Sequence, residues 1–328
     1  PTSVLVTGYD ILFFWVARMM MFGLYAMADR GPEGAIPFRT IALHGMVRDE
    51  HGKKMSKSAG NTVDPVEWMD AYGTDAVRFT LARAANPGTD APIGESAVQA
   101  SRNFGTKLWN ATRFALANGA DPALPLPARP TDADAWILGR LHEVAAATDA
   151  LLEDFQFAKA VEGLYHFTWD ELCDWYVELA KVQLRDPATA DGTRAVLGHV
   201  FDVLVRLLHP ITPFLTEALW QALRRTTDRS VVVAEWPATA GAPVDRSAAA
   251  RLLDLQKVVT EIRRFRTEQR VPDARRVAAR LTGLDEAGLR EHHAALASLV
   301  RLDEPGAGFA PTATLEISLP GGAVLVEI

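Results

Sequence analysis

The sequence predicts an α/β segment, then an all-α region, then a small α+β tail. Two short apolar runs, at residues 2–7 and 40–43, alternate with helical patterns within the first 85 residues. From residue 131 onward, apolar residues recur at spacings of three and four, which is typical of amphipathic helices. The last fifty residues return to short apolar runs bounded by glycine and proline, which indicates strands.

The α/β segment opens with a strand over residues 2–7 that ends at Gly8, and an apolar helix over 11–28 follows it. We expect Gly31-Pro32 and Gly34 to break that helix before the second strand begins. A strand followed by a helix, twice and with short connections, predicts a parallel sheet.

Helices dominate the rest of the chain. Asp64 followed by Pro65 marks a helix start, because aspartate caps a first turn and proline suits its first position. Four prolines between residues 121 and 130 indicate a linker. The amphipathic helices beyond it predict an antiparallel bundle. The predicted helices cover 65–72, 75–85, 96–118, 131–155, 161–179, 196–208, 213–223, 248–270 and 286–300, and strands cover 230–234, 277–281, 314–319 and 323–328.

The composition limits the classes of protein. The 328 residues, 48% hydrophobic and 23% charged, allow two or three domains with a sizeable core. The single cysteine, Cys173, excludes an internal disulfide and a cysteine-rich zinc site, and fits a reducing cytoplasm. The net charge of −7 gives no overall attraction for nucleic acid, so such binding requires a local basic patch. No uncharged apolar stretch reaches eighteen residues, and we expect no membrane span.

The loop from Gly52 to Asn61 is the most informative segment. Lys53, Lys54 and Lys57 lie within five positions among glycine and serine. Such a loop is mobile, exposes backbone N–H groups and concentrates positive charge, as the binding of a triphosphate and release of pyrophosphate require. The alternative is a solvated basic surface loop.

The run Lys54-Met55-Ser56-Lys57-Ser58 is identical to the second signature of the class I aminoacyl-tRNA synthetases. Gly60-Asn61 and Asp64-Pro65 follow it, as in the branch specific for valine, isoleucine and leucine. The resemblance implies the C-terminal half of a Rossmann-type nucleotide-binding domain, followed by an anticodon-binding bundle. It also implies that Lys57 contacts the ATP phosphates as a catalytic residue and that Lys54 supports it, with Ser56 and Ser58 as further ATP contacts.

The end of the first strand resembles the family's Gly-x-Asp segment, which has a tryptophan five residues on. That resemblance implies that Gly8 and Asp10 contact the aminoacyl-adenylate and that Trp15 lines the amino-acid pocket. A doubly wound fold places ligand contacts at this end of a strand. The alternatives are a helix cap for Asp10 and a core aromatic for Trp15. His44-Gly45 resembles the pair that lies near the adenine of ATP, and the alternative is a strand end followed by a turn.

Further stretches resemble the valine-specific members of the family. They are residues 102–104, 107–110, 169–176 and 209–214. The implied partners are ATP with Mg²⁺, valine and the tRNA for valine, without a zinc site or any other metal site in this chain and without a membrane. The single cysteine argues against the zinc module usual in isoleucine enzymes. Leucine or isoleucine specificity and a non-catalytic RNA-binding module remain alternatives.

Several parts of the family are not found in this sequence. The first signature, His-x-Gly-His, the editing insertion and the C-terminal coiled-coil arm are not present. Pro1 leads directly into the first strand without a targeting peptide, so we expect an excised fragment. Because the first signature stabilises the phosphorus that reacts in this family, its absence implies that the fragment is inactive alone. The expected domains are the catalytic half at 1–90, a connecting stem-contact region at 91–130, the anticodon-binding domain at 131–275 and an α+β segment at 276–328.

A local basic patch lies at residues 251–280, which hold nine Arg or Lys and four Asp or Glu, a net +5. Its densest part is Arg263, Arg264 and Arg266, and arginine pairs well with phosphate. These three residues are the predicted tRNA contacts. The alternative is a solvated helix face with Glu–Arg pairs. We expect His292-His293 to be an exposed helical pair.

Overall fold

A computed structural model describes residues 1–328 except 57, 59, 225–228 and 239–244. The chain forms two compact units, each assembled from three stretches of sequence. Unit 1 comprises Pro1–Asn110, Glu143–Trp169 and Val203–Thr239, and unit 2 comprises Ala111–His142, Asp170–Asp202 and Ala240–Ile328. The boundaries between the units fall within several helices. Each unit is described by itself below.

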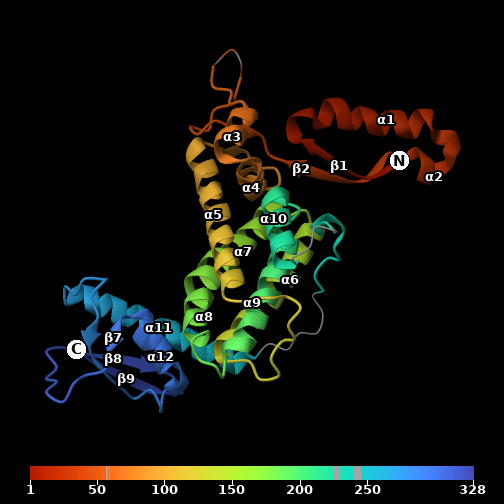
Figure 1. The fold of residues 1–328 in the computed structure, drawn as a ribbon. Coiled ribbons are helices and arrows are strands. Elements are labelled where there is room, and N and C mark those ends of the chain that lie inside the picture. The colour runs from red at the N-terminus through yellow and green to blue at the C-terminus, as the bar shows by residue number, and fades with distance from the viewer. Residues whose placement is uncertain (57, 59, 225–228, 239–244) are drawn as a thin grey trace. The chain divides into compact units, whose positions relative to one another are not determined.

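Unit 1 begins with the predicted parallel pair of strands. β1 (Thr2–Gly8) and β2 (Phe38–His44) run in the same direction, with Gly8 opposite His44 at their carboxyl ends. The connection between them is helical and lies beside the two strands (Figure 1). The pairing confirms the expected parallel sheet for these two strands. Two parallel strands need such a crossover connection.

The crossover is not the single helix that the apolar pattern predicts. It consists of η1 (Tyr9–Ile11), a π-helical turn η2 (Leu12–Val16), α1 (Ala17–Ala26), η3 (Ala28–Arg30) and α2 (Gly31–Ala35). The apolar helix ends before Gly31, whose φ of +70° interrupts the winding, as expected, but Gly31, Pro32 and Gly34 then begin a new short helix, α2, and not a loop. Proline fits a first helical turn, where its missing N–H has no partner to lose.

The same crossover is strongly apolar on its outside. Tyr9–Ala26 has a mean hydropathy of 1.2 with 6% of the segment buried, so by length and composition it could cross a membrane, contrary to the sequence expectation. Its place between two parallel strands gives another reason for its apolar character, because crossover helices of α/β folds are covered by packing. Phe13, Phe22 and Tyr25 are 82%, 70% and 89% exposed in this chain.

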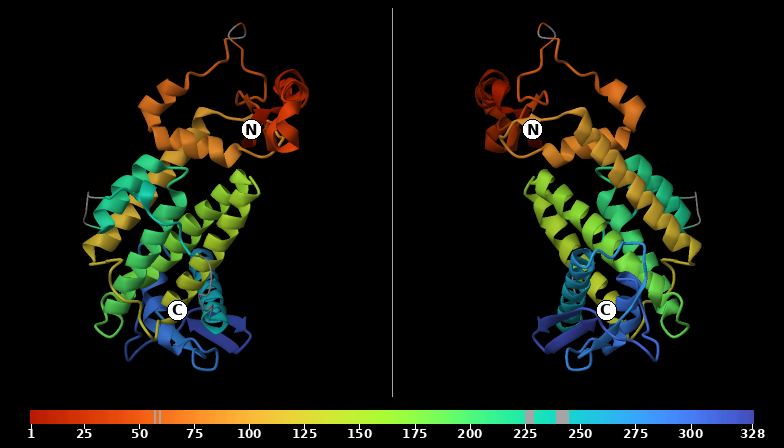
Figure 2. Two further views of the ribbon diagram at one scale, coloured as in Figure 1. Left: turned by 90° about the vertical axis from the view of Figure 1, so that its right-hand side faces the viewer. Right: turned by 90° about the vertical axis from the view of Figure 1, so that its left-hand side faces the viewer.

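The rest of the first hundred residues surrounds a small core. β3 (Val47–Arg48) pairs in parallel with β4 (Ala91–Pro92), and α3 (Pro65–Tyr72), α4 (Thr74–Ala84) and α5 (Glu95–Ala117) pack near them. Asp64 caps α3 as predicted, because its carboxylate accepts the backbone N–H of Val66 at 2.8 Å. Two further views of the helices around these strands are given in Figure 2.

The predicted helices of the central region are present. They are α6 (Asp132–Glu153), α7 (Phe157–His166), η5 (Phe167–Tyr176), α8 (Val177–Gln183), α9 (Ala190–Leu208), α10 (Pro213–Arg224) and α11 (Arg246–Glu268). η5 is a π-helix, so the predicted single helix over 161–179 changes its winding in the middle. In unit 1 the Phe79 and Phe104 rings stack at 4.5 Å between centroids, and Tyr165 lies 5.4 Å from Phe104.

The expected strand at 230–234 is wrong. Three valines favour a strand, but residues Val231–Val233 form the 3₁₀ turn η6. The carboxylate of Glu217 on α10 accepts the Ser230 hydroxyl at 2.6 Å and the Val231 N–H at 3.1 Å. These bonds hold the backbone in a turn, and a strand would need a neighbouring strand instead.

The tail of unit 2 has the expected α+β composition. β5 (Val277–Ala278) pairs with β7 (Leu302–Asp303), and β6 (Arg280–Thr282), β9 (Gly322–Glu327) and β8 (Thr314–Leu319) form an antiparallel sheet in that order. The predicted hairpin is confirmed. The predicted helix over 286–300 is shorter, as η7 (Arg290–His292) and α12 (His293–Leu299).

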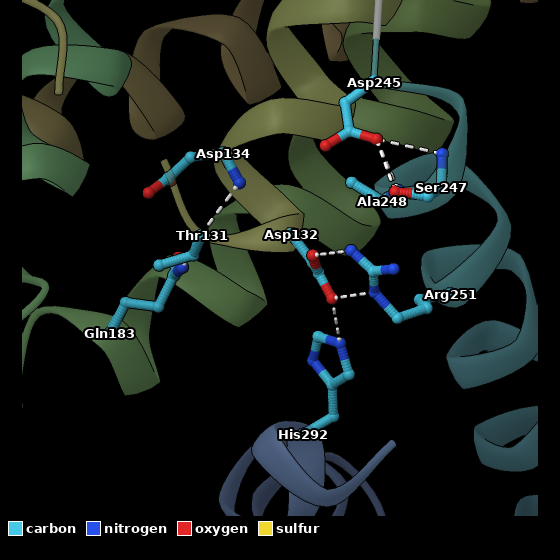
Figure 3. A network of polar contacts seen from close by, with 9 residues as sticks. All are labelled: Thr131, Asp132, Asp134, Gln183, Asp245, Ser247, Ala248, Arg251 and His292. Atoms are coloured by element: carbon cyan, nitrogen blue, oxygen red, sulfur yellow. Dashed lines mark hydrogen bonds and ion pairs between the residues drawn. The ribbon is translucent and has the colours of Figure 1, made fainter. Parts of the chain in front are cut away.

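A partly buried ionic network joins three of these elements in unit 2 (Figure 3). Asp132, at the start of α6, accepts two hydrogen bonds of 2.6 Å from Arg251 on α11. It also contacts His292 Nε2 at 3.0 Å. Burial raises the pKa of Asp132, but the bonds and charges of Arg251 and His292 outweigh it and hold that pKa far below its usual value. The expected exposed histidine pair is therefore wrong for His292, which is 9% exposed.

Candidate nucleotide site and signature loop

The predicted adenylate contacts meet at the carboxyl ends of β1 and β2. A Cβ atom at Gly8 would lie 2.8 Å from Asp10 Oδ1, 3.2 Å from Met46 Sδ and 3.4 Å from His44 Cε1. A glycine at position 8 therefore lets these three side chains approach one backbone position. The structure brings Gly8, Asp10 and His44 together, although they lie up to 36 positions apart in the sequence.

The backbone after His44 is packed against a distant segment. A Cβ atom at Gly45 would lie 1.6 Å from the carbonyl oxygen of Thr89, so only glycine fits there. The neighbouring Asp90 accepts the Met46 N–H at 2.8 Å and the Tyr9 hydroxyl at 3.0 Å, and it pairs with Arg48. The Met46 N–H, followed by these side chains, lowers the pKa of Asp90, although burial opposes it.

Asp90 therefore ties two parts of the candidate site together. Tyr9 lies between Gly8 and Asp10, while Arg48 belongs to β3, which leads into the signature loop. The Arg48 guanidinium also donates to the Gly52 carbonyl at 3.4 Å. Sequence reasoning missed Asp90 and Arg48, because no local pattern marks two residues 42 positions apart as partners.

Trp15 lies differently from the other predicted contacts. It belongs to the π-helical turn η2 and is 59% exposed. The alternative of a core aromatic is therefore wrong within this chain. Asp10 lies in η1 and is exposed as well, and no side-chain cap bond begins η1.

The signature loop is ordered at its base by short local bonds. Asp49 N–H donates to the Lys53 carbonyl at 3.0 Å, and Lys54 forms an antiparallel bridge with Arg48. Gly52 has a φ of +77°, which suits glycine in this turn. Lys54 is exposed, and the Ser56 and Ser58 hydroxyls lie 3.2 Å apart. Lys57, the predicted catalytic lysine, lies outside the described residues.

Met55 of the signature has a packing role, unlike the charged lysines beside it. It lines a mostly apolar cavity of about 300 Å³ beneath the loop. Other lining residues are Val47 of β3, Trp68 of α3, Ile93 between β4 and α5, and Val98 of α5. Within the loop, Met55 therefore makes the apolar contact with the domain, whereas the neighbouring Lys54 is exposed.

The three predicted tRNA-binding arginines of α11 have different environments. Arg263 lies over the Trp175 ring, with 5.9 Å between its guanidinium carbon and the ring centroid. Arg264 is exposed and pairs with Glu261 at 3.1 Å and Glu268 at 3.4 Å, which agrees with the alternative of a solvated face.

Arg266 is buried, with 5% of its surface exposed. It donates to the carbonyl oxygens of Arg275, Pro272 and Arg301, at distances of 2.5 to 3.4 Å. Burial lowers its pKa. These bonds connect the end of α11 to the tail, so the guanidinium of Arg266 is used within the fold.

Metal chemistry has no candidate among the residues that the structure describes. No group of three or more His, Cys, Asp or Glu side chains in that part of the chain could hold an ion. Cys173 is buried, as expected for a cysteine that packs within a helix.

The comparisons with known proteins define the class. Residues 1–93 match the family of class I tRNA synthetases for isoleucine, leucine, methionine and valine, and residues 134–281 match the anticodon-binding domain of tRNA ligases. The chain belongs to the class I tRNA synthetases. Its catalytic-domain segment and anticodon-binding domain follow each other in the expected order.

Among individual proteins, the chain is similar to bacterial valine–tRNA ligases. It is 56% identical to that of Nocardia farcinica over all of the chain and 38% of the relative. It is 57% identical to that of Streptomyces coelicolor over 97% of the chain and 36% of the relative. The chain thus spans little more than a third of the length of these relatives.

Two solved structures share the fold. A LeuRS–tRNA–LeuAMS ternary complex from Agrobacterium radiobacter superposes with a TM-score of 0.60 at 22% identity, over 75% of this chain and 29% of that one. Methionyl-tRNA synthetase of Mycobacterium tuberculosis, in complex with methionyl-adenylate, has a TM-score of 0.53 at 23% identity, over 70% of this chain and 47% of that one.

Proposed function

We propose that the protein to which this chain belongs attaches valine to its tRNA through a valyl-adenylate formed from ATP. This chain supplies the signature loop and the anticodon-binding domain. The observation on which the proposal rests is the identity of 53–57% to valine–tRNA ligases along the chain, with every residue of the second signature present.

Two finer assignments of the fold belong to this proposal. β1, its helical crossover and β2 form part of the C-terminal half of a Rossmann-type domain, supported by the parallel pairing of the strands. The helices α6 to α11 form an anticodon-binding bundle, supported by the match to that domain over residues 134–281. The α+β tail from residue 276 would precede a C-terminal arm.

The proposed chemistry uses the loop and the strand ends differently. A valine carboxylate oxygen bonds to the α-phosphorus of ATP while the bond to pyrophosphate breaks. Lys57 neutralises charge on the phosphates as it develops, with support from Lys54 and from the Ser56 and Ser58 hydroxyls. Mg²⁺ would enter with the triphosphate and neutralise part of its charge, and this ion usually needs no dedicated protein cage.

The strand ends would hold the rest of the substrates. Gly8 and Asp10 contact the adenylate, and Trp15 covers the amino acid, while His44 and Gly45 lie by the adenine. The meeting of Gly8, Asp10 and His44 at one sheet edge supports this, because ligands of doubly wound folds bind at the carboxyl ends of strands.

For tRNA, Arg263 and Arg264 remain the proposed phosphate contacts. Both are exposed on α11. Arg266 is left out of the proposal, because its guanidinium is buried and bonded to backbone carbonyls. The ion pairs of Arg264 with glutamates are solvent-exposed and weak, so a phosphate could replace them.

The test is amino-acid-dependent exchange of pyrophosphate into ATP by the full-length protein. Valine should support exchange, whereas the isolated 328 residues should give none. Lys57→Ala should lower the rate by about 10²–10³, as the loss of one charge-stabilising contact does. Lys53→Ala is the matched control, because it removes the same charge from the same loop, four positions before Lys57. It should lower the exchange rate by less than about tenfold.

Other outcomes would replace the proposal with one of its alternatives. Exchange with leucine or isoleucine in place of valine would change the substrate. Tight tRNA binding without exchange by any amino acid would indicate an RNA-binding module. Robust exchange by the isolated chain, or an unchanged rate for Lys57→Ala, would contradict the role given to this segment or to that lysine.

A further inference from the structure

The side chain of Asn61, at the end of the signature loop, bonds to Lys54 and Ser56 within the loop and to Asp49 ahead of it. Its Oδ1 accepts the Ser56 N–H at 3.0 Å. Its Nδ2 donates to Asp49 Oδ2 at 2.8 Å and to the Lys54 carbonyl at 3.3 Å. One amide therefore binds the residue before the loop and two residues of the signature, and it uses both its donor and its acceptor.

Asp49 completes the connection from the other arm. Its Oδ1 accepts the N–H groups of Lys53 at 2.7 Å and His51 at 3.1 Å, while Oδ2 accepts from Asn61. The bond from Asn61, followed by that from Lys53, lowers the pKa of Asp49, although burial opposes it. The carboxylate is therefore ionised at neutral pH, and each of its oxygens is used.

We propose that Asp49 and Asn61 form a clasp that sets the position of the signature loop, so that both act as positioning residues for the adenylation step. This inference rests on the proposed function. Lys57 lies four residues before Asn61 and eight after Asp49, so holding these two residues together limits where the lysine can reach. A loop that must follow moving phosphates can bend at its tip, but its base has to stay in register with the nucleotide site.

The clasp makes a specific prediction for Asn61→Asp in the full-length protein. The new carboxylate faces that of Asp49 and has no N–H for it, so the two arms repel each other. The rate constant kcat of valine-dependent exchange should fall by about tenfold or more, because small displacements of a catalytic group are costly. The KM for valine should change less than about twofold, since the amino-acid contact proposed above, Trp15, lies outside the loop.

The reciprocal double variant Asp49→Asn with Asn61→Asp separates positioning from simple damage. Asn at 49 can donate to Asp at 61, which restores the bond between the two arms with the charge moved to the other arm. Asp at 61 also still accepts the Ser56 N–H, and only the long bond to the Lys54 carbonyl stays lost. We expect kcat to recover to within about threefold of wild type, as non-additivity between contacting residues predicts. A purely local structural role would give the double variant the sum of two defects.

His51→Ala is the matched control. His51 lies on the same turn, and its side chain pairs with Glu50 at 3.5 Å. Its charge is the smallest of the influences on the pKa of Asp49. Its backbone N–H still donates to Asp49, so exchange should be unchanged. Melting temperatures measured for all variants show whether folding is affected.

The outcomes distinguish this inference from the function on which it depends. If wild type shows no valine-dependent exchange, the proposed function fails before the clasp is tested. If wild type is active and Asn61→Asp retains its kcat, the clasp is wrong. It is also wrong if the double variant is no more active than Asn61→Asp while both melt like wild type.

Discussion

At the scale of single residues, α11 shows how little a local charge pattern says about the role of each charge. Arg263, Arg264 and Arg266 lie within four positions, yet one covers a tryptophan ring, one pairs with glutamates and one is buried. A helix rotates by about 100° per residue, so neighbours in sequence face different surroundings. Asp49 and Asn61 are a second example, because these two side chains bond to each other across 12 positions of sequence that carry no pattern to pair them.

The different environments predict different effects of Arg266→Ala and Arg264→Ala on stability. Arg266→Ala should lower the free energy of unfolding by about 2–3 kcal/mol, because it removes a buried guanidinium and its hydrogen bonds to three backbone carbonyl groups. Arg264→Ala should change it by less than about 0.5 kcal/mol, because its ion pairs are exposed. Urea unfolding of the two variants measures both.

Arg264→Ala also tests the proposed binding of tRNA. Arg264→Ala should reduce the slope of log K against log salt for tRNA binding by about one, the loss of one phosphate contact. Equal stability losses for the two variants would contradict the burial argument, and an unchanged slope would remove Arg264 from the tRNA surface.

At the scale of elements, helix starts depend on caps that come from near and far. Asp64 caps the helix that follows it, as its sequence context predicts. The start of α10 uses Asp75 on α4 instead, whose carboxylate accepts the Leu215 N–H at 2.6 Å and the Phe214 N–H at 3.4 Å. Burial raises the pKa of Asp75, and these N–H groups oppose the rise.

Asp75→Ala should therefore destabilise unit 1 by about 1–2 kcal/mol, the usual cost of removing a cap. Asp75→Asn retains an acceptor and should cost less. Chemical unfolding followed by circular dichroism measures both. A loss for Asp75→Ala no larger than for Asp75→Asn would show that the cap bonds contribute nothing.

At the scale of the folded unit, unit 2 depends on contacts between segments that are remote in sequence. Arg251 lies 119 positions and His292 160 positions from Asp132, yet both bind its carboxylate. The carboxylate therefore links α6, α11 and η7. Removing one partner of such an ion pair lowers the stability of the fold strongly, because a buried charge remains without compensation.

This network predicts a pH-dependent effect of Asp132→Asn. The pKa of Asp132 is depressed in the folded state, so its contribution is present above the unfolded pKa of about 4 and is lost as the pH falls toward the folded value. Asp132→Asn should cost about 2–3 kcal/mol at pH 7, as charge-assisted bonds do, and clearly less near pH 3. Urea unfolding at the two pH values tests it, and an equal cost at both would contradict the assignment.

The sequence by itself determined the order of helices and strands, the parallel pair, the C-terminal hairpin and the signature loop. Periodicity, caps and turn residues are local properties, and the signature is a contiguous run. Only the tertiary structure decided what depends on distant partners. It converted the valines of η6 into a turn, buried Arg266 and His292, and gathered Gly8, Asp10 and His44 at one sheet edge. The physical reason is that burial and hydrogen bonding are properties of pairs of residues, and a sequence pattern does not list its pairs.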